Sequence, residues 1–210
     1  MSWMIKRKLS FLNTKPPRQA SKAQSLVEFA ITLPVIFILF TGVVEFGFAL
    51  NFYLSIMDAT RYAARQGADW SPYVAGSYTR DETFYDNVLG ETAKFLDPSL
   101  TYGGTYQGRK LPLDPDLDDV IVSVYASCDG VITLVGNDLM YGNTTTGVSQ
   151  STIQSHLVSG SPASGILVVE VYYSYEQVLR LPWLTAFVPD PMMLRAYSIM
   201  PLRAAEPECP

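Results

Sequence analysis

The pattern of apolar and polar positions divides the chain near residue 45. From Leu26 to Val44 the only ionisable residue is Glu28, and most of the other side chains are apolar. This run is close to the roughly 20 residues that an α-helix needs to cross the hydrocarbon layer of a membrane. Glu45 follows directly, and the aromatic residues after it are typical of the water interface of a bilayer. The pattern therefore predicts one membrane-spanning helix near the N-terminus.

The helical pattern continues beyond the apolar run. Residues 50–66 contain neither Gly nor Pro and are rich in helix-forming side chains, and Gly67 is a natural stop. We therefore expect one helix from Ser25 to Gln66, roughly 60 Å long at 1.5 Å per residue, whose second half packs on a folded domain. Pro34 removes one backbone donor from this helix, which predicts a bend there.

The rest of the chain alternates between short helical and strand patterns, separated by turns rich in Gly and Pro. A capping box at residues 79–82 predicts a helix to Leu96, and a second box at 151–154 predicts another short helix. A Pro-bounded apolar stretch at 181–190 predicts a short helix or a loop packed on a sheet. β-branched runs predict strands at 119–127, 131–135 (as an edge strand), 166–175 and 194–200. This order predicts an α+β domain with an antiparallel sheet.

The charge distribution separates the two ends of the chain. Residues 1–23 hold six basic side chains and no acidic one, whereas all 20 acidic residues lie after residue 23. Because basic flanks stay in the cytoplasm, we expect a cytoplasmic leader at 1–23, a helix at 24–67 and an exported domain at 68–210. An acidic exported domain argues against nucleic-acid binding, which needs a basic face.

The residues that could support catalysis or metal binding are few. The single histidine, His156, has no nucleophile motif near it in the sequence. Three aspartates begin a stretch that is similar to a calcium-binding loop, but Asp119 and Tyr125 stand where such a loop needs Gly and Glu. An acidic turn in solvent is therefore favoured over a calcium site, and the sequence predicts neither an enzyme nor a cofactor. The three aspartates are Asp114, Asp116 and Asp118.

The two cysteines, Cys128 and Cys209, both lie in the part of the chain expected to be exported. A disulfide between them is compatible with an oxidising compartment. Two free thiols are the alternative, and the sequence leaves both open.

The acidic residue inside the apolar run has three interpretations. In a plain signal anchor, Glu28 only starts the helix, where the helix dipole favours an acid. In a cleaved secretory signal, Gly47-Phe-Ala49, with its two small residues, forms the cleavage site. In the third, a cut between Ala23 and Gln24 creates a new N-terminal ammonium one helical turn from Glu28. The same chain or a neighbour could then neutralise the carboxylate in lipid.

The residues around the third cleavage site resemble a known family. Gln24–Pro34, Val44–Gly47, Asn51 and Ala59–Ala68 together are similar to the TadE-like pseudopilins, accessory subunits of the tight-adherence (Flp, type IVc) pilus machinery. The resemblance implies a pilin-like fold and a prepilin peptidase that cuts before Gln24. It further implies that Glu28, with Glu45 as a second acidic position, takes part in assembly. This family usually has Gly before the cut, where this chain has Ala23.

The resemblance implies a structural, non-catalytic subunit of a pilus or secretion apparatus. Its expected partners are the membrane, other pilin or pseudopilin subunits through the N-terminal helix, and the prepilin peptidase. The alternative is an unprocessed single-pass membrane anchor whose exported domain binds a ligand or a wall component.

Overall fold

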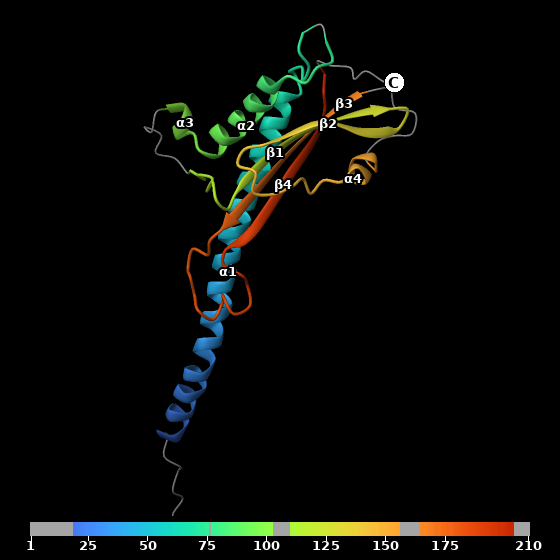
Figure 1. The fold of residues 1–210 in the computed structure, drawn as a ribbon. Helices are drawn as coiled ribbons and strands as arrows, with labels where there is room; N and C mark the ends of the chain where they lie inside the picture. Colours follow the sequence, from blue (N-terminus) through green and yellow to red (C-terminus); the bar gives the residue numbers. More distant parts are fainter. Residues whose placement is uncertain (1–18, 76, 103–109, 156–163, 204–210) are drawn as a thin grey trace, which may run out of the picture. The chain divides into compact units, whose positions relative to one another are not determined.

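The computed structural model describes residues 19–75, 77–102, 110–155 and 164–203, and for residues 19–23, 101 and 102 it describes the backbone only. The chain divides into two compact units, residues 1–43 and residues 44–210. The boundary falls inside one continuous helix, so residues 44–67 of that helix pack as part of the second unit (Figure 1).

That helix is α1, Gln19–Gly67. It begins earlier than the predicted Ser25, because Ala20, Lys22 and Ala23 are good helix formers. Its C-terminal end at Gly67 is as predicted. Pro34 lies inside the helix, and the bend expected there stays a prediction.

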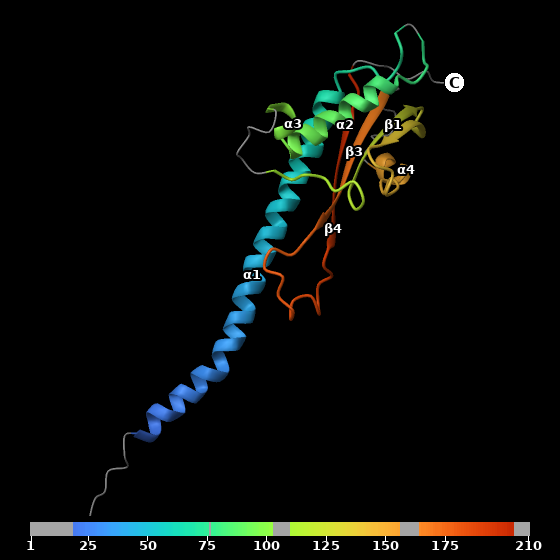
Figure 2. The same ribbon diagram turned by 60° about the vertical axis from the view of Figure 1, so that its left-hand side comes forward.

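The second unit contains a four-stranded antiparallel sheet, as the sequence predicts. Its strands are β1 (Asp119–Cys128), β2 (Val131–Leu139), β3 (Ser164–Tyr175) and β4 (Met192–Pro201), in the spatial order β2-β1-β3-β4. β1 and β3 are almost continuously buried because each has a strand on both sides and protein on both faces. The architecture is thus α+β, with a long N-terminal apolar helix followed by a small antiparallel sheet and short helices (Figure 2).

One strand is longer than the sequence predicts. β2 runs to Leu139, whereas a strand was expected only to Val135. A bulge opposite Val124 and Tyr125 shifts the register between the two strands and lets residues 136–139 continue the pairing with β1. The Gly, Asn and Asp in that stretch conceal the strand because these residues are rare in sheets.

The shorter helices begin at other caps than the sequence predicts. α2 (Glu82–Leu96) is capped by Asp81, whose side chain accepts from the N–H of Thr83 at 3.0 Å. α4 (Gln150–Gln154) is capped by Ser149. The capping boxes at 79–82 and 151–154 therefore located the helices but gave the wrong cap residue in each. A single turn, α3 (Ser99–Tyr102), follows α2.

The main core lies between the sheet and the helices α1 and α2. Small side chains on α1, including Ala59, Ala63 and Ala64, are fully buried there, and they allow the helix backbone to approach the sheet closely. At Gly67 there is no room for a side chain, since a Cβ at this position would lie 2.7 Å from Cδ2 of Leu167 on β3. The opposite face of the sheet carries a second cluster, which the segment around α4 covers.

Candidate functional site

The first part of α1 is apolar on every side. All side chains from Gln24 to Phe40 are exposed, and Leu26, for example, keeps 70% of its surface accessible. Among the described residues, the helix from Gln24 to Gly67 alone is long and apolar enough to cross a membrane. A helix that exposes apolar side chains all around is stable only when lipid or other protein covers it.

Several polar side chains within this segment make hydrogen bonds within the helix. The Nε2 amide of Gln24 donates to Oε1 of Glu28 at 3.0 Å, and the hydroxyl of Thr32 donates to the backbone oxygen of Glu28 at 2.7 Å. Residues 24 and 28 therefore lie on one face within hydrogen-bond reach, as their spacing of one helical turn requires. The side chain of Ala23 lies outside the described part of the structure, and cleavage before Gln24 stays a prediction.

The second acid of the helix, Glu45, is placed quite differently. It is only 5% exposed, and its carboxylate is held by three donors of the same chain. Oε1 accepts from the phenol of Tyr175 at 2.5 Å and from the N–H of Val178 at 2.8 Å. Oε2 accepts from the N–H of Leu179 at 2.9 Å. We call this cluster the Glu45 clamp.

The three donors of the clamp replace the hydrogen bonds to water that the Glu45 carboxylate loses when it is buried. Burying a lone carboxylate is costly, and several well-directed donors offset that cost even when none carries a full charge. Burial raises the pKa of the Tyr175 phenol far above its ordinary value, and the hydrogen bond to Glu45 raises it further. The phenol therefore stays protonated as a donor. The sequence suggested Glu45 for assembly or charge pairing, whereas the structure gives it neutral partners within its own domain.

The clamp holds one end of the segment that connects β3 to β4. The backbone N–H of Gln177 donates to Oδ1 of Asp190 at 3.0 Å, and its Nε2 donates to the oxygen of Val188 at 3.1 Å, which closes the base of the loop. The sequence predicts a helix or loop packed on the sheet at 181–190. The structure has the loop alternative, a series of turns, in which Phe187 is 85% exposed.

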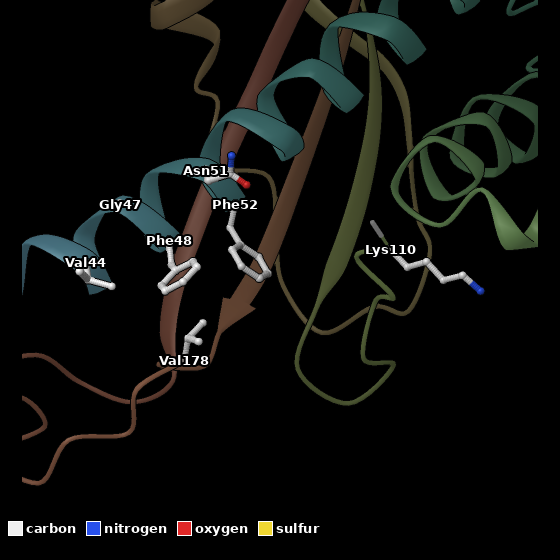
Figure 3. A pocket seen from close by; sticks show the side chains of 7 residues that line it. All are labelled: Val44, Gly47, Phe48, Asn51, Phe52, Lys110 and Val178. Carbon is white, nitrogen blue, oxygen red and sulfur yellow. The ribbon is translucent and has the colours of Figure 1, made fainter. Parts of the chain in front are cut away.

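A groove runs beside the clamp, between α1 and the start of this connecting segment. Its volume is about 620 Å³. Figure 3 shows Val178 close to the rings of Phe48 and Phe52, while the ammonium of Lys110 points away from them. The remaining lining residues are Val44, Gly47 and Asn51. The groove is therefore mainly apolar, with its one charged residue at the rim.

The aspartates of the predicted acidic turn serve the local fold. Asp118 is buried and accepts from the N–H groups of Asp114 at 2.8 Å and Ser174 at 2.6 Å, while Asp114 accepts from the N–H of Asp116 at 2.9 Å. Burial raises the pKa of the Asp118 carboxyl. Within the part of the chain that the structure describes, no three His, Cys, Asp or Glu residues are grouped to hold a metal. Calcium at Asp114, Asp116 and Asp118, the less favoured interpretation of the sequence, stays untested.

Two predicted residues fall outside the described part of the chain, His156 and Cys209. Cys128 is the last residue of β1. The disulfide between Cys128 and Cys209 stays a prediction.

Sequence reasoning missed the burial of an acid on β3. Glu170, on β3, is fully buried and pairs with Arg195 of β4, whose Nη2 lies 2.8 Å from Oε2 of the carboxylate. Tyr172 donates to the same oxygen at 3.1 Å. A single glutamate in the middle of an otherwise apolar strand was the available signal, because a buried acid needs a partner. This pair links β3 to β4, and neither residue lines the groove.

Comparison with known proteins adds one finding. A family model described as "TadE-like protein" matches residues 23–65. This stretch of the chain is TadE-like. The match begins at the predicted cleavage site and covers α1 as far as Arg65, so the resemblance inferred from the sequence is confirmed there. No curated protein and no solved structure matches the chain. The TadE-like match connects the chain with the tight-adherence pilus system.

Proposed function

We propose that this protein is a structural, non-catalytic pseudopilin-type subunit for assembly of a tight-adherence pilus or secretion apparatus. The observation that carries the proposal is the coincidence of the TadE-like match with the fully exposed apolar part of α1. An apolar helix of this length can cross a bilayer and, because all of its sides are apolar, can also pack against the same helix of other subunits.

The proposed topology is a single membrane pass with the basic leader in the cytoplasm and the sheet domain outside the cell. It is supported by the six basic residues of the leader and by the acidic composition of the domain. In this topology a prepilin peptidase cuts between Ala23 and Gln24. The mature protein stays in the membrane or enters the pilus through α1, with other pilin or pseudopilin subunits as its partners.

Glu28 is the residue that the proposal assigns to assembly. Its carboxylate lies on the same helix face as Gln24, one turn away, and the surrounding side chains are exposed and apolar. In lipid an acid at this position is unfavourable unless a positive group neutralises it. The new ammonium of Gln24 in a neighbouring subunit would supply that charge, and the pairing would fix the register of the two helices.

The experiment that tests processing is N-terminal sequencing of the protein extracted from membranes of cells with an intact pilus system. We expect the mature chain to begin at Gln24. A matched variant, Ala23→Gly, restores the usual residue of the family and is expected to give the same N-terminus. An N-terminus at Met1 or Leu50 in the unaltered protein would contradict the proposed processing, and Met1 would favour an unprocessed membrane anchor instead.

A further inference from the structure

The segment that follows the Glu45 clamp is unusually apolar for an exposed connection. Between Gln177 and Pro189 the only ionisable side chain is that of Arg180, which pairs with Glu176. Phe187 has a larger exposed fraction than any other large apolar side chain in the described part of the chain. The segment also contains Trp183, and Trp is enriched where bilayers meet water.

The clamp defines where this segment lies along the helix. Glu45 directly follows the apolar run, and its carboxylate holds the N–H groups of Val178 and Leu179. If the apolar run crosses the membrane, Glu45 marks the level at which α1 leaves the hydrocarbon layer. The segment after Leu179 therefore begins at the surface of the bilayer. This step rests on the membrane insertion that the proposed function includes.

The backbone of the segment suits a lipid environment. Within it, the N–H groups of Leu184, Phe187 and Val188 donate to backbone oxygens of the same segment at 2.9 Å, and that of Thr185 does so at 3.2 Å. The hydroxyl of Thr185 donates to the oxygen of Pro182. Backbone groups that bond within their own segment lower the cost of leaving water, which is the main obstacle for a loop that enters lipid.

From these observations we infer that residues 178–188 form a second membrane contact, which inserts Trp183 and Phe187 into the outer lipid interface. The Glu45 clamp holds the segment against the helix, so the domain contacts the bilayer at two points. The partner is the phospholipid surface. Arg180, at the start of the segment and highly exposed, lies where a lipid phosphate would be reached. The apolar groove beside Phe48 and Phe52 shares Val178 with this contact.

The position of Trp183 can be measured directly in vesicles. The full chain is reconstituted in phosphatidylcholine vesicles in which one lipid carries bromine near the glycerol end of its acyl chains. In one sample Trp3→Phe and Trp70→Phe leave Trp183 as the only tryptophan, and in the other Trp3→Phe and Trp183→Phe leave Trp70; excitation at a wavelength that tyrosine does not absorb restricts the signal to tryptophan. Trp70 follows the far end of α1, roughly 33 Å from Glu45 at 1.5 Å per residue, and serves as the matched control.

We expect bromine to reduce the emission of Trp183 at least twofold and to leave that of Trp70 unchanged. Equal quenching of the two would overturn the inference. A second outcome would also overturn it. If the emission of Trp183 changed with the amount of protein per vesicle and not with bromine, a second protein chain would cover the segment. Resistance to carbonate extraction measures helix insertion independently. A chain that is not inserted contradicts the proposed function as well, whereas an inserted chain without quenching contradicts only this inference.

A pair of surface variants separates membrane contact from folding. Phe187→Ser in the Trp183 sample is expected to lower the bromine quenching, since the most exposed ring no longer holds the segment in lipid. Val131→Ser is the matched change, because Val131 is 60% exposed and begins β2, at the end of the sheet away from the connecting segment. Equal bromine quenching in the two variants would show that Phe187 does not take part in the membrane contact.

Discussion

The two halves of α1 belong to one helix but differ in what surrounds their side chains. Residues 24–40 are mostly apolar and exposed on all sides, whereas residues 44–67 bury one face, which includes Ile56 and several alanines, against the sheet domain. The first half therefore depends on an environment outside its own chain, and the second half depends on the sheet domain. A change in one half should affect insertion or assembly, and a change in the other should affect folding.

The two acids of the helix show the same difference at the level of single residues. Glu28 lies among exposed apolar side chains, with the amide of Gln24 as its hydrogen-bond donor, whereas Glu45 is buried and holds three donors from distant parts of its own domain. In the sequence, Glu28 and Glu45 look alike, because each is an acid within or next to the apolar run. The structure shows Glu45 bound within its own domain, whereas the role of Glu28 between molecules is part of the proposed function.

The largest difference in domain stability is expected between two single variants, one in each half of α1. Ala63→Glu puts an unpaired carboxylate into the core between α1 and the sheet, where Ala63 is fully buried. We expect it to destabilise the domain by about 4 kcal/mol or more, enough to abolish cooperative unfolding. Protease resistance and near-UV circular dichroism of the full chain in detergent measure the loss.

The matched change in the first half is Ala30→Glu, at an exposed position. Here the domain should keep its protease resistance, and the cost of about 3 kcal/mol should fall on membrane insertion instead. If Ala30→Glu unfolded the domain, or Ala63→Glu left it intact, the two halves of the helix would not differ as described.

The second largest effect is expected on hydrogen exchange in the segment that the Glu45 clamp holds. Glu45→Ala leaves the Tyr175 phenol and two backbone N–H groups without their acceptor, and each such group costs about 1 kcal/mol or more. We expect the amides of Val178 and Leu179 to lose at least tenfold in hydrogen-exchange protection. Mass spectrometry of peptides covering residues 176–180 measures this change.

The control for the clamp is Asp58→Ala, in the same half of the helix. Asp58 is largely exposed and reaches Arg61 only at 4.0 Å, so its loss should change stability by less than about 0.5 kcal/mol. Protection at residues 176–180 that survives Glu45→Ala would mean that other contacts hold the connecting segment.

Local pattern was sufficient for most elements of the fold. The apolar run and Gly67 predicted the helix, and the β-branched runs predicted the central strands, because these signals lie within a few neighbouring residues. The role of Glu45 was not predictable in this way, since its partners are more than 100 residues away in the sequence. The prediction of the helix caps was wrong for a different reason. Several polar side chains stand near each helix start, and the pattern alone does not show which of them accepts from the backbone, as Asp81 and Ser149 do.

The smallest effect is expected in the core, at a tyrosine on α2. The hydroxyl of Tyr85 is buried without a hydrogen-bond partner in the described structure, and burial raises the pKa of this phenol to about 12, although Arg80 nearby opposes the shift. Tyr85→Phe should therefore be neutral or stabilising by up to about 1 kcal/mol near pH 8.

The pH dependence gives this prediction a sign. A phenol whose pKa is raised in the folded state favours folding below the unfolded pKa of about 10, and that contribution is lost as the pH rises toward 12. The unaltered protein should thus lose stability relative to Tyr85→Phe between pH 10 and 12. Parallel denaturant titrations of both proteins across this range measure the difference. A constant difference would contradict the burial of the hydroxyl.

The most direct test of the claim that Glu28 acts between molecules is the amount of surface pilus formed with Glu28→Ala. Ile31→Ala, at a similarly exposed position of the same helix, is the control. We expect Glu28→Ala to leave membrane insertion and the hydrogen-exchange protection of the domain unchanged, because it only makes the helix more apolar, and to abolish or strongly reduce piliation. Wild-type piliation with Glu28→Ala, at equal protein levels, would contradict the claim.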